Sequence, residues 1–566
     1  MSLDTIIRNG SIVDGTGKPA AHSDLGIQDG KIAKIGDLTN IEAGNVIDAT
    51  DQIVTPGFVD LHTHLDAQVG WDPELTSSSY HGVTTALIGN CGVGFAPVSE
   101  DNRSYMAKLM ESVEDIAAEA ILDGLPWDWT SYGGYLDSIQ SLNPALNIVG
   151  LAGHSSIRFE AMGDRSMDEG VQADDRELAH IVKLVEESVA EGAVGFSTSR
   201  FLPHTVPDGR CTPGTWADLR ETRAIQEAVI RTGGEGAIFQ SANDFQTRFE
   251  TEVEMFEQGA ELGCQIIFSG GASAKGDGGV SRWRDFFEKQ EAKDRRVAGI
   301  CHTRPSGAFF GLAQLSPFTK ESQAWRDLMA LPGVPARVEA MSHPELRQKL
   351  IDEGIAAGSM KQLAHMLHPF GVATTPNLDF DRESSLQQLA DEARVDPVEI
   401  YVDRLIASEG REFFNLWMFG GALENQWEYM RLPNIVPMLG DAGAHVGFFT
   451  DTDSPTVLLS ELTRRHGVYS LEEAIHRITQ KSADILGLKD RGILKEGYVA
   501  DINVIDYTNL STRHPEYVND FPHGGGRFVV KSHGYTATLV AGQVVVENCK
   551  HTGVRPGEVI REFARG

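Results

Sequence analysis

The stretch Thr55–His64 reads TPGFVDLHTH, and the interpretation of the whole chain depends on it. A Pro-Gly turn precedes an apolar run that ends in His-x-His, which is the pattern of a short buried strand carrying two histidines at its carboxyl end. Because side chains alternate along a strand, His62 and His64 lie on one face. Two neutral imidazoles on one face are typical of a metal site. The alternative, two ordinary surface histidines, does not account for the strand and its turn.

Seven further apolar runs follow this strand, and helix-like segments such as 175–191 and 219–232 lie between them. Eight strands separated by helices predict an α/β fold, a (β/α)8 TIM-like barrel. A doubly wound sheet is the competing architecture, but no GxGxxG turn follows a first strand. The predicted barrel strands are 57–61, 84–88, 147–151, 192–196, 237–239, 265–268, 298–300 and 435–439.

Both ends of the chain are rich in short strands and turns. Asn9-Gly10 and Asp29-Gly30 predict hairpins, and Ala541-Gly542 joins two apolar runs near the other end. We therefore expect residues 1–55 and 495–566 to form one small β-sandwich from both termini, and residues 56–494 to form the barrel. The long stretch at about 304–432, between the last two strands, predicts a helical insertion that acts as a lid.

Composition limits the range of functions. Lys and Arg total 49 and Asp and Glu total 81, so the formal net charge is −32. An acidic chain repels phosphate groups, which argues against a nucleic-acid or anionic-membrane surface. The five cysteines are far apart, and we find neither a signal peptide nor a long apolar run, so we expect a protein of the reducing cytoplasm.

Two further residues end strands beside the His-x-His motif. Cys91 ends the second predicted strand and is flanked by glycines. Its side chain is either a thiolate ligand of the metal or a small buried hydrophobic group. Asp441 ends the last strand, which lies beside the first in a closed barrel. Its carboxylate would then contact the metal and accept a proton from the bound water, although a helix-capping role is the simpler alternative.

Three other residues lie at the predicted catalytic face. His445 follows Asp441 and is equally a metal ligand, a substrate contact or a loop histidine. His154 ends the third strand, and we expect it to contact the substrate or the transition state, with a structural histidine as the alternative. Arg158 is suited to binding a carboxylate through bidentate pairing, and an ordinary surface arginine is about as plausible.

These motifs resemble the amidohydrolase superfamily, and within it the N-acyl-D-amino-acid deacylase (D-aminoacylase) branch. The resemblance extends over nearly the whole chain. It implies a metal-dependent barrel with a β-sandwich from both termini, and hydrolysis of an amide with zinc bound. The stretches that carry it are NGSIVDGTG, PGFVDLHTH, NCGVGFAPV, GHSSIR, GDAGAH and DRGILKEGYVADINVID.

The chain departs from this branch at several metal ligands. The branch has histidines at the ends of the fifth and sixth strands, where this sequence has none, and the fourth strand offers no lysine. We therefore expect the second metal pocket of the family to be missing. Gln240 and Asn243 would replace lost ligands weakly or bind substrate, and His302 is a reserve ligand or substrate contact. The remaining single site consists of His62, His64, Asp441 and Cys91.

The sequence thus predicts a metal-dependent hydrolase of a C–N bond, an N-acyl amino acid deacylase that uses a metal-activated water. The expected cofactor is one Zn²⁺ per chain, with another divalent metal as the alternative. Hydrolysis of a cyclic amide or lactam is the second hypothesis, and a catalytically inactive scaffold subunit is the third. The expected partner is a small-molecule amide, with a second copy of the chain left open. A serine hydrolase and a P-loop enzyme are disfavoured because GxSxG and GxxxxGK[ST] are absent.

Overall fold

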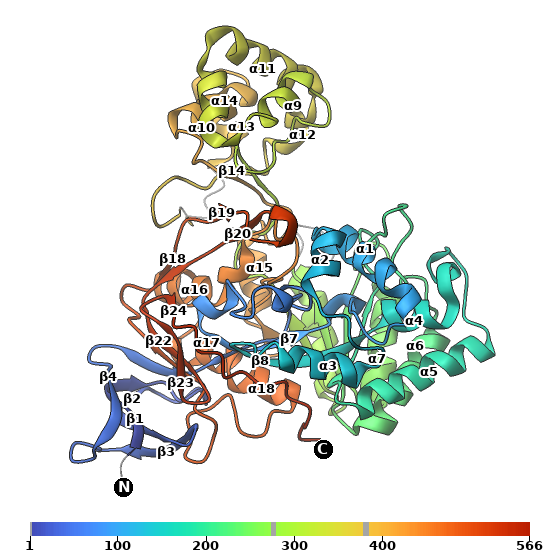
Figure 1. Cartoon of the computed structure of the whole chain (residues 1–566), viewed down its shortest axis with the longest axis vertical. Helices are drawn as coiled ribbons and strands as arrows, with labels where there is room; N and C mark the ends of the chain where they lie inside the picture. The colour runs from blue at the N-terminus through green and yellow to red at the C-terminus, as the bar shows by residue number, and fades with distance from the viewer. Residues whose placement is uncertain (1–2, 273–278, 377, 379–383, 566) are drawn as a thin grey trace.

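The computed structural model describes residues 3–272, 279–376, 378 and 384–565. Three parts are visible in Figure 1: a barrel of strands and helices, a sheet that contains both the first and the last strands of the chain, and a helical lobe at the opposite end of the long axis. The described part of the chain contains no helix long and apolar enough to cross a membrane.

The barrel contains eight parallel strands, so all eight predicted runs are strands. They follow one another around the sheet in sequence order, and nearly all their residues are buried, as expected where helices cover a parallel sheet. The strands are β6 (Phe58–Asp60), β7 (Val83–Ile88), β8 (Asn147–Gly153), β9 (Gly195–Ser199), β10 (Ile238–Ala242), β11 (Gln265–Ser269), β12 (Val297–Ile300) and β16 (Ile435–Val436).

The fourth strand lies three residues beyond its predicted start. Helix α5 (Asp175–Ala190) ends just before it, and Gly192 and Ala193 form the turn, so that pairing begins at Gly195. A capping box between Asp174 and Glu177 starts α5 where the sequence predicted it. The other helices around the barrel are α1 (Arg103–Glu114), α2 (Ala118–Gly124), α3 (Tyr132–Ser141), α4 (His154–Met162), α6 (Leu219–Gly233), α7 (Phe249–Glu261), α8 (Gly279–Glu291), α15 (Leu423–Met430), α16 (Ser454–Val457), α17 (Leu471–Ile478) and α18 (Gln480–Leu486).

The ends of the first and last barrel strands meet. Thr63 and Ala442 form a parallel bridge, and the His64 N–H donates to the Ala442 carbonyl at 2.7 Å. Gly443, at φ 91°, permits this approach, because a Cβ there would lie 2.4 Å from the His64 carbonyl oxygen. The closure brings the residues that follow β6 and β16 side by side.

The two termini build one nine-stranded mixed sheet. Its path runs β24 (Lys550–His551), β23 (Gln543–Glu547), β22 (Tyr535–Val540), β17 (Ile502–Ile505), β5 (Ile53–Pro56), β1 (Leu3–Ile12), β2 (Ala21–Gln28) and β3 (Lys31–Gly36), and β4 (Ala43–Asp48) pairs with β1.

Two of the three predicted turns in this sheet are confirmed. Asp29-Gly30 joins β2 to β3, and Ala541-Gly542 joins β22 to β23, with positive φ at all four residues. The predicted hairpin at Asn9-Gly10 is wrong. The pair lies inside the single strand β1 as a bulge, and β2 pairs with β1 on both sides of it.

Hydrophobic packing ties the sheet to the barrel. One cluster on the sheet includes Ile7, Leu25, Ile502 and Leu539, whereas Tyr535 and Val545 belong to the barrel core. Residues after β24 then leave the sheet and run along the barrel, where Val559 bridges Ile148 in β8. The domain boundaries 1–55, 56–494 and 495–566 stay predictions.

Six described helices in the stretch 304–432 build the lobe seen at the top of Figure 1, whereas α15 of the same stretch packs against the barrel helix α8. The lobe has its own hydrophobic core, which includes Phe318, Trp325 and Tyr401. Strands β13 (Phe309–Phe310), β14 (Leu367–Pro369) and β15 (Phe414–Leu416) form a small sheet at its base. The helices are α9 (Gln323–Met329), α10 (Gly333–Ser342), α11 (Pro344–Ala357), α12 (Ser359–Leu363), α13 (Leu386–Ala393) and α14 (Pro397–Ala407).

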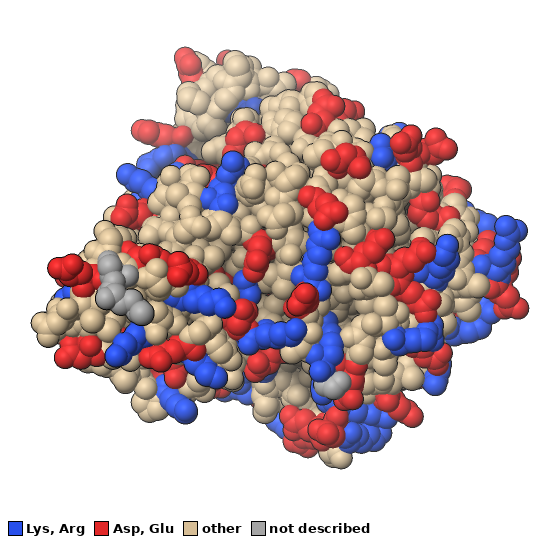
Figure 2. Space-filling model, turned by 60° about the horizontal axis from the view of Figure 1, so that its bottom comes forward, with Lys and Arg blue, Asp and Glu red and all other residues tan. Residues whose placement is uncertain are grey.

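Two further pairs of short strands are β18 (Ser511–Thr512) with β21 (Ser532–His533) and β19 (Glu516–Val518) with β20 (Arg527–Val529). On the face shown in Figure 2, acidic and basic side chains are interspersed. The excess of acidic residues is therefore distributed on this face and does not form one continuous patch.

Replacing Gly443 by alanine tests the closure of the barrel. A left-handed backbone costs an alanine about 1–2 kcal/mol, and the clash with the His64 carbonyl adds to that loss. Gly358, in the left-handed conformation at φ 78° with no atom within 4 Å of its would-be Cβ, is the matched control. Urea unfolding should show a clearly larger loss of unfolding free energy for Gly443→Ala than for Gly358→Ala. Equal losses would contradict the proposed close approach.

Candidate metal centre

His62 and His64 follow β6 and are both buried. His62 Nε2 lies 3.2 Å from Asp441 Oδ1, and His64 Nε2 lies 3.9 Å from the same oxygen. Both rings thus direct Nε2 toward one carboxylate oxygen. Asp441 reaches this position because the last strand closes against the first.

Cys91 joins this group from the loop after β7. Its Sγ lies 3.3 Å from His62 Nε2, and the ligand atoms of His62, His64 and Cys91 all lie within 4.8 Å of one another. The loop places the thiol by unusual backbone angles, with φ 55° at Cys91 between Gly89 at 76° and Gly92 at 70°. The Asn90 side chain donates to the Thr63 carbonyl at 3.1 Å, which ties the loop to the His-x-His segment.

The donor set fits a zinc-type ion. Zinc bonds to nitrogen are about 2.0–2.1 Å, so ligand atoms at the corners of a tetrahedron lie about 3.3 Å apart. The distances from His62 Nε2 to Asp441 Oδ1 and to Cys91 Sγ are 3.2 and 3.3 Å. Two imidazoles, a thiol and a carboxylate are also the chemical types that zinc binds.

Groups behind the ligands fix their orientation. The Ser269 hydroxyl lies 3.2 Å from His62 Nδ1, and the Asp60 carboxylate accepts the His62 backbone N–H at 3.0 Å. On the other ring, Glu114 Oε1 lies 3.1 Å from His64 Nδ1. In each imidazole the second nitrogen faces a polar group, which leaves Nε2 for the centre.

Burial controls the ionisation of the site. It lowers the pKa of His62 to about 3 and that of His64 well below its usual value, so both imidazoles are neutral at pH 7. It raises the pKa of Asp441 to about 7, with the nearby Asp451 charge adding to the effect, and raises the Cys91 pKa well above its ordinary value. A bound cation would reverse the shifts of the acidic groups.

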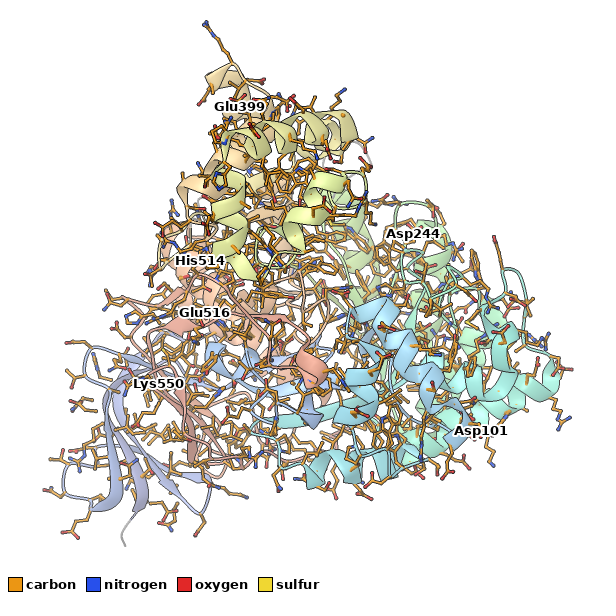
Figure 3. The ribbon with its side chains drawn as sticks, turned by 45° about the horizontal axis from the view of Figure 1, so that its top comes forward. Asp101, Asp244, Glu399, His514, Glu516 and Lys550 are labelled. Carbon is orange, nitrogen blue, oxygen red and sulfur yellow. The ribbon has the colours of Figure 1, made fainter. Side chains whose placement is uncertain are left out.

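The group lies in a cavity of about 1440 Å³, larger than the roughly 300–1,000 Å³ of many small-molecule sites. Barrel loops and the helical lobe share its walls. Asp244, which follows β10 of the barrel, lines the cavity and lies beside the lobe in Figure 3. Glu399 is labelled at the far end of the lobe in the same view. From the lobe and its base, the lining includes His365, Met366, His368, Gln387, Asp391, Trp417, Met418 and Phe419.

Three other predicted residues also line this cavity, namely Asn243, His302 and His445. The His302 ring stacks against Phe419 with centroids 5.8 Å apart. His445 has a left-handed backbone at φ 47°, as does Asp441 at 43°. Such angles cost energy in residues other than glycine and are frequent where a fold holds functional groups in place.

Gln240 has a different position from the one predicted. It is fully buried, does not line the cavity, and its Oε1 accepts the Cys91 backbone N–H at 3.0 Å. Gln240 therefore supports the loop that carries the thiol.

His154 and Arg158 lie away from the cavity, so their predicted contacts with substrate are not retained. His154 is fully buried, with Nδ1 2.8 Å from the Thr198 hydroxyl and Nε2 2.9 Å from Glu221. Arg158 Nε donates to the same Glu221 oxygen at 2.9 Å. Both ring nitrogens are occupied because the strand end turns directly into α4, which packs against α5 and β9.

Three residues of the site were not predicted from the sequence: Glu114, His204 and Ser269. His204 lines the cavity, and its Nδ1 lies 2.8 Å from the Ser199 hydroxyl. Ser269 ends β11, the sixth barrel strand, at whose end the family resemblance implies a metal-binding histidine. No local pattern marks Glu114, the last residue of α1.

Several known proteins resemble this chain over almost its full length. The D-aminoacylase and the N-acyl-D-aspartate deacylase of Alcaligenes xylosoxydans xylosoxydans are each 26% identical to it, and the alignments cover 99% and 98% of this chain and 98% and 95% of those proteins. An uncharacterized protein of Mycobacterium tuberculosis is 28% identical over 96% of this chain and 92% of its own length.

Solved structures share the fold. A crystal structure of D-aminoacylase superposes with a TM-score of 0.66 at 21% identity, covering 99% of this chain and 100% of that chain. The N-acyl-D-glutamate deacylase of Bordetella bronchiseptica, solved with zinc and a phosphonate inhibitor, gives 0.65 at 21% identity and the same coverage. The family model described as the amidohydrolase family matches residues 45–546. This match covers most of the chain, and the protein therefore belongs to the amidohydrolase family.

Proposed function

We propose that this protein is a zinc-dependent hydrolase of an amide C–N bond in a small molecule, with an N-acyl amino acid as the first candidate substrate. The observation that carries the proposal is the convergence of His62, His64, Cys91 and Asp441 within the cavity. Three relatives that span the chain are a D-aminoacylase, an N-acyl-D-aspartate deacylase and an N-acyl-D-glutamate deacylase, which supports the substrate class. A scaffold has no physical need for this donor set.

In this proposal four residues of the centre hold the metal ion, and one of them also transfers a proton. His62, His64, Cys91 and Asp441 would hold the ion, which when bound lowers the pKa of water and polarises a carbonyl. Water adds to the amide carbon, the C–N bond breaks, and a carboxylate and an amine are released. Asp441 holds the proton taken from water and passes it to the departing nitrogen.

A second candidate, a neutral or cyclic amide, is favoured by the cavity wall. Arg282 is the one Lys or Arg among the described residues that line the cavity. Its guanidinium pairs with Glu250 at 3.0 Å and lies 3.1 Å over the Phe249 ring. A cationic partner favours binding of the carboxylate of an N-acyl amino acid, and Arg282 would have to exchange Glu250 for it.

Metal analysis tests the centre directly. We expect about one zinc per chain, as in a single site of three or four protein ligands, and nearly none in the His62→Ala/His64→Ala double variant. Cys91→Ala should bind zinc more weakly than the unaltered protein. Elemental analysis after dialysis against trace zinc measures all three. A protein that takes up no zinc would support the scaffold alternative.

A substrate panel tests the reaction. N-acyl-D- and N-acyl-L-amino acids, their carboxamide-capped forms and cyclic amides should be assayed with added zinc by amine release. We expect Asp441→Asn to lower kcat/KM by at least about 100-fold, because proton transfer is lost. Asp501→Asn, which alters a buried carboxyl outside the cavity lining, is the control and should keep its activity. Turnover of the cyclic or capped amides alone would select the second candidate.

Zinc binding should weaken as the pH falls. Below about 7 the Asp441 carboxyl of the metal-free protein is protonated and must release that proton before it can bind the ion. The His62 imidazole, with its pKa lowered to about 3, does not compete with zinc for protons in this range. Competition with a fluorescent zinc chelator between about pH 5 and 8 should show falling affinity. The Cys91 thiol must also lose its proton on binding zinc, so an affinity independent of pH would exclude both Asp441 and Cys91 as ligands.

A further inference from the structure

Glu114 is a buried carboxylate at the end of helix α1. Its side chain is 2% exposed, and its helical neighbours Met110 and Val113 belong to the hydrophobic core of the barrel. Asp115, in the left-handed conformation at φ 58°, ends the helix directly after it. Burying a carboxylate in apolar surroundings costs free energy unless polar partners compensate. The partners of Glu114 therefore indicate why the residue is there.

Those partners belong to the metal centre. Glu114 Oε1 lies 3.1 Å from His64 Nδ1, and Oε2 lies 3.9 Å from His445 Nε2. The backbone of Glu114 also contacts the same loop, because the His445 N–H donates to its carbonyl oxygen at 2.7 Å. One residue of α1 thus contacts both a predicted ligand after β6 and a cavity-lining histidine after β16.

The contact with His64 orients the ring. A carboxylate facing Nδ1 favours the tautomer that carries its proton there, and Nε2 is then free as a ligand on the side of Asp441. Oε1 has no hydrogen bond of good geometry among the described residues, so the N–H of His64 is the donor within reach. His62 differs, since its Nδ1 faces the neutral Ser269 hydroxyl.

We propose that Glu114 is the positioning residue of the metal centre, orienting His64 through Nδ1 and anchoring the loop of His445. The inference rests on the proposed metal site and concerns its assembly, not the identity of the substrate. A carboxylate in this position also raises the basicity of the imidazole, and removal of such partners lowers metal affinity by about 10- to 100-fold in other proteins.

The test is the zinc affinity of Glu114→Gln, measured by chelator competition. Glutamine keeps the size of the side chain and the backbone contact with His445, but it removes the charge. We expect about a 10- to 100-fold weaker affinity, and partial recovery in Glu114→Asp, which restores the carboxylate. In the cobalt-substituted protein, the visible absorption that reports ligand geometry should change in Glu114→Gln.

Glu221→Gln is the matched control, because Glu221 is also buried and also faces a histidine, His154, but outside the cavity lining. It should keep the zinc affinity of the unaltered protein. If it does not fold, Glu412→Gln, another buried carboxylate outside the cavity lining, replaces it. Unchanged affinity and cobalt spectrum in Glu114→Gln would overturn the proposal, as would an equal loss in the control. Absence of zinc binding in the unaltered protein would instead refute the proposed metal site.

Discussion

The contact between the ends of the first and last barrel strands is the constraint on which the rest of the structure depends. The His64 N–H donates to the Ala442 carbonyl at 2.7 Å, and the absence of a side chain at Gly443 makes that approach sterically allowed. This contact brings the Asp441 carboxylate to the two histidines. Without it, the His-x-His motif would lack the Asp441 carboxylate, which approaches both rings.

Burial then determines the protonation states of the residues at the candidate metal centre. The imidazoles lie in an apolar interior that keeps them neutral, while Asp441, Glu114 and Cys91 all have raised pKa values in the metal-free protein. Several acidic groups that resist ionisation, grouped around neutral nitrogen donors, are an environment that a cation stabilises. The positive φ values of Cys91, Asp441 and His445 show that the backbone conformations holding these side chains are themselves costly.

The helical lobe determines the size and character of the cavity. The metal ligands lie on the barrel, whereas Met366, Trp417, Met418 and Phe419 come from the lobe and its base. Met418 and Phe419, which line the cavity, are 54% and 40% exposed. In the proposed enzyme the barrel would supply the reacting groups, and the lobe would supply part of the surface that contacts the substrate.

The sequence alone was sufficient to predict the barrel, its eight strands, the sheet shared by both termini, and the pairing of His62 and His64. These features follow from alternation, turn chemistry and strand order, which are local or depend only on the sequence of elements. It was also sufficient to place Cys91 and Asp441 at strand ends that a closed barrel brings together. The hairpin predicted at Asn9-Gly10 was wrong because a left-handed backbone is compatible with either a hairpin turn or a bulge. Pairing of β1 with β2 on both sides of this pair makes it a bulge.

Only the tertiary structure decided which polar side chains meet. His154 ends a strand on the expected face, yet Glu221 and Thr198 occupy both of its nitrogens. Glu114, which no motif marks, reaches His64 from the end of α1, whose Met110 and Val113 pack into the barrel core. Side-chain partners of this kind are set by contacts between distant elements, and the free energy of burying a charge depends on neighbours that no local pattern reveals.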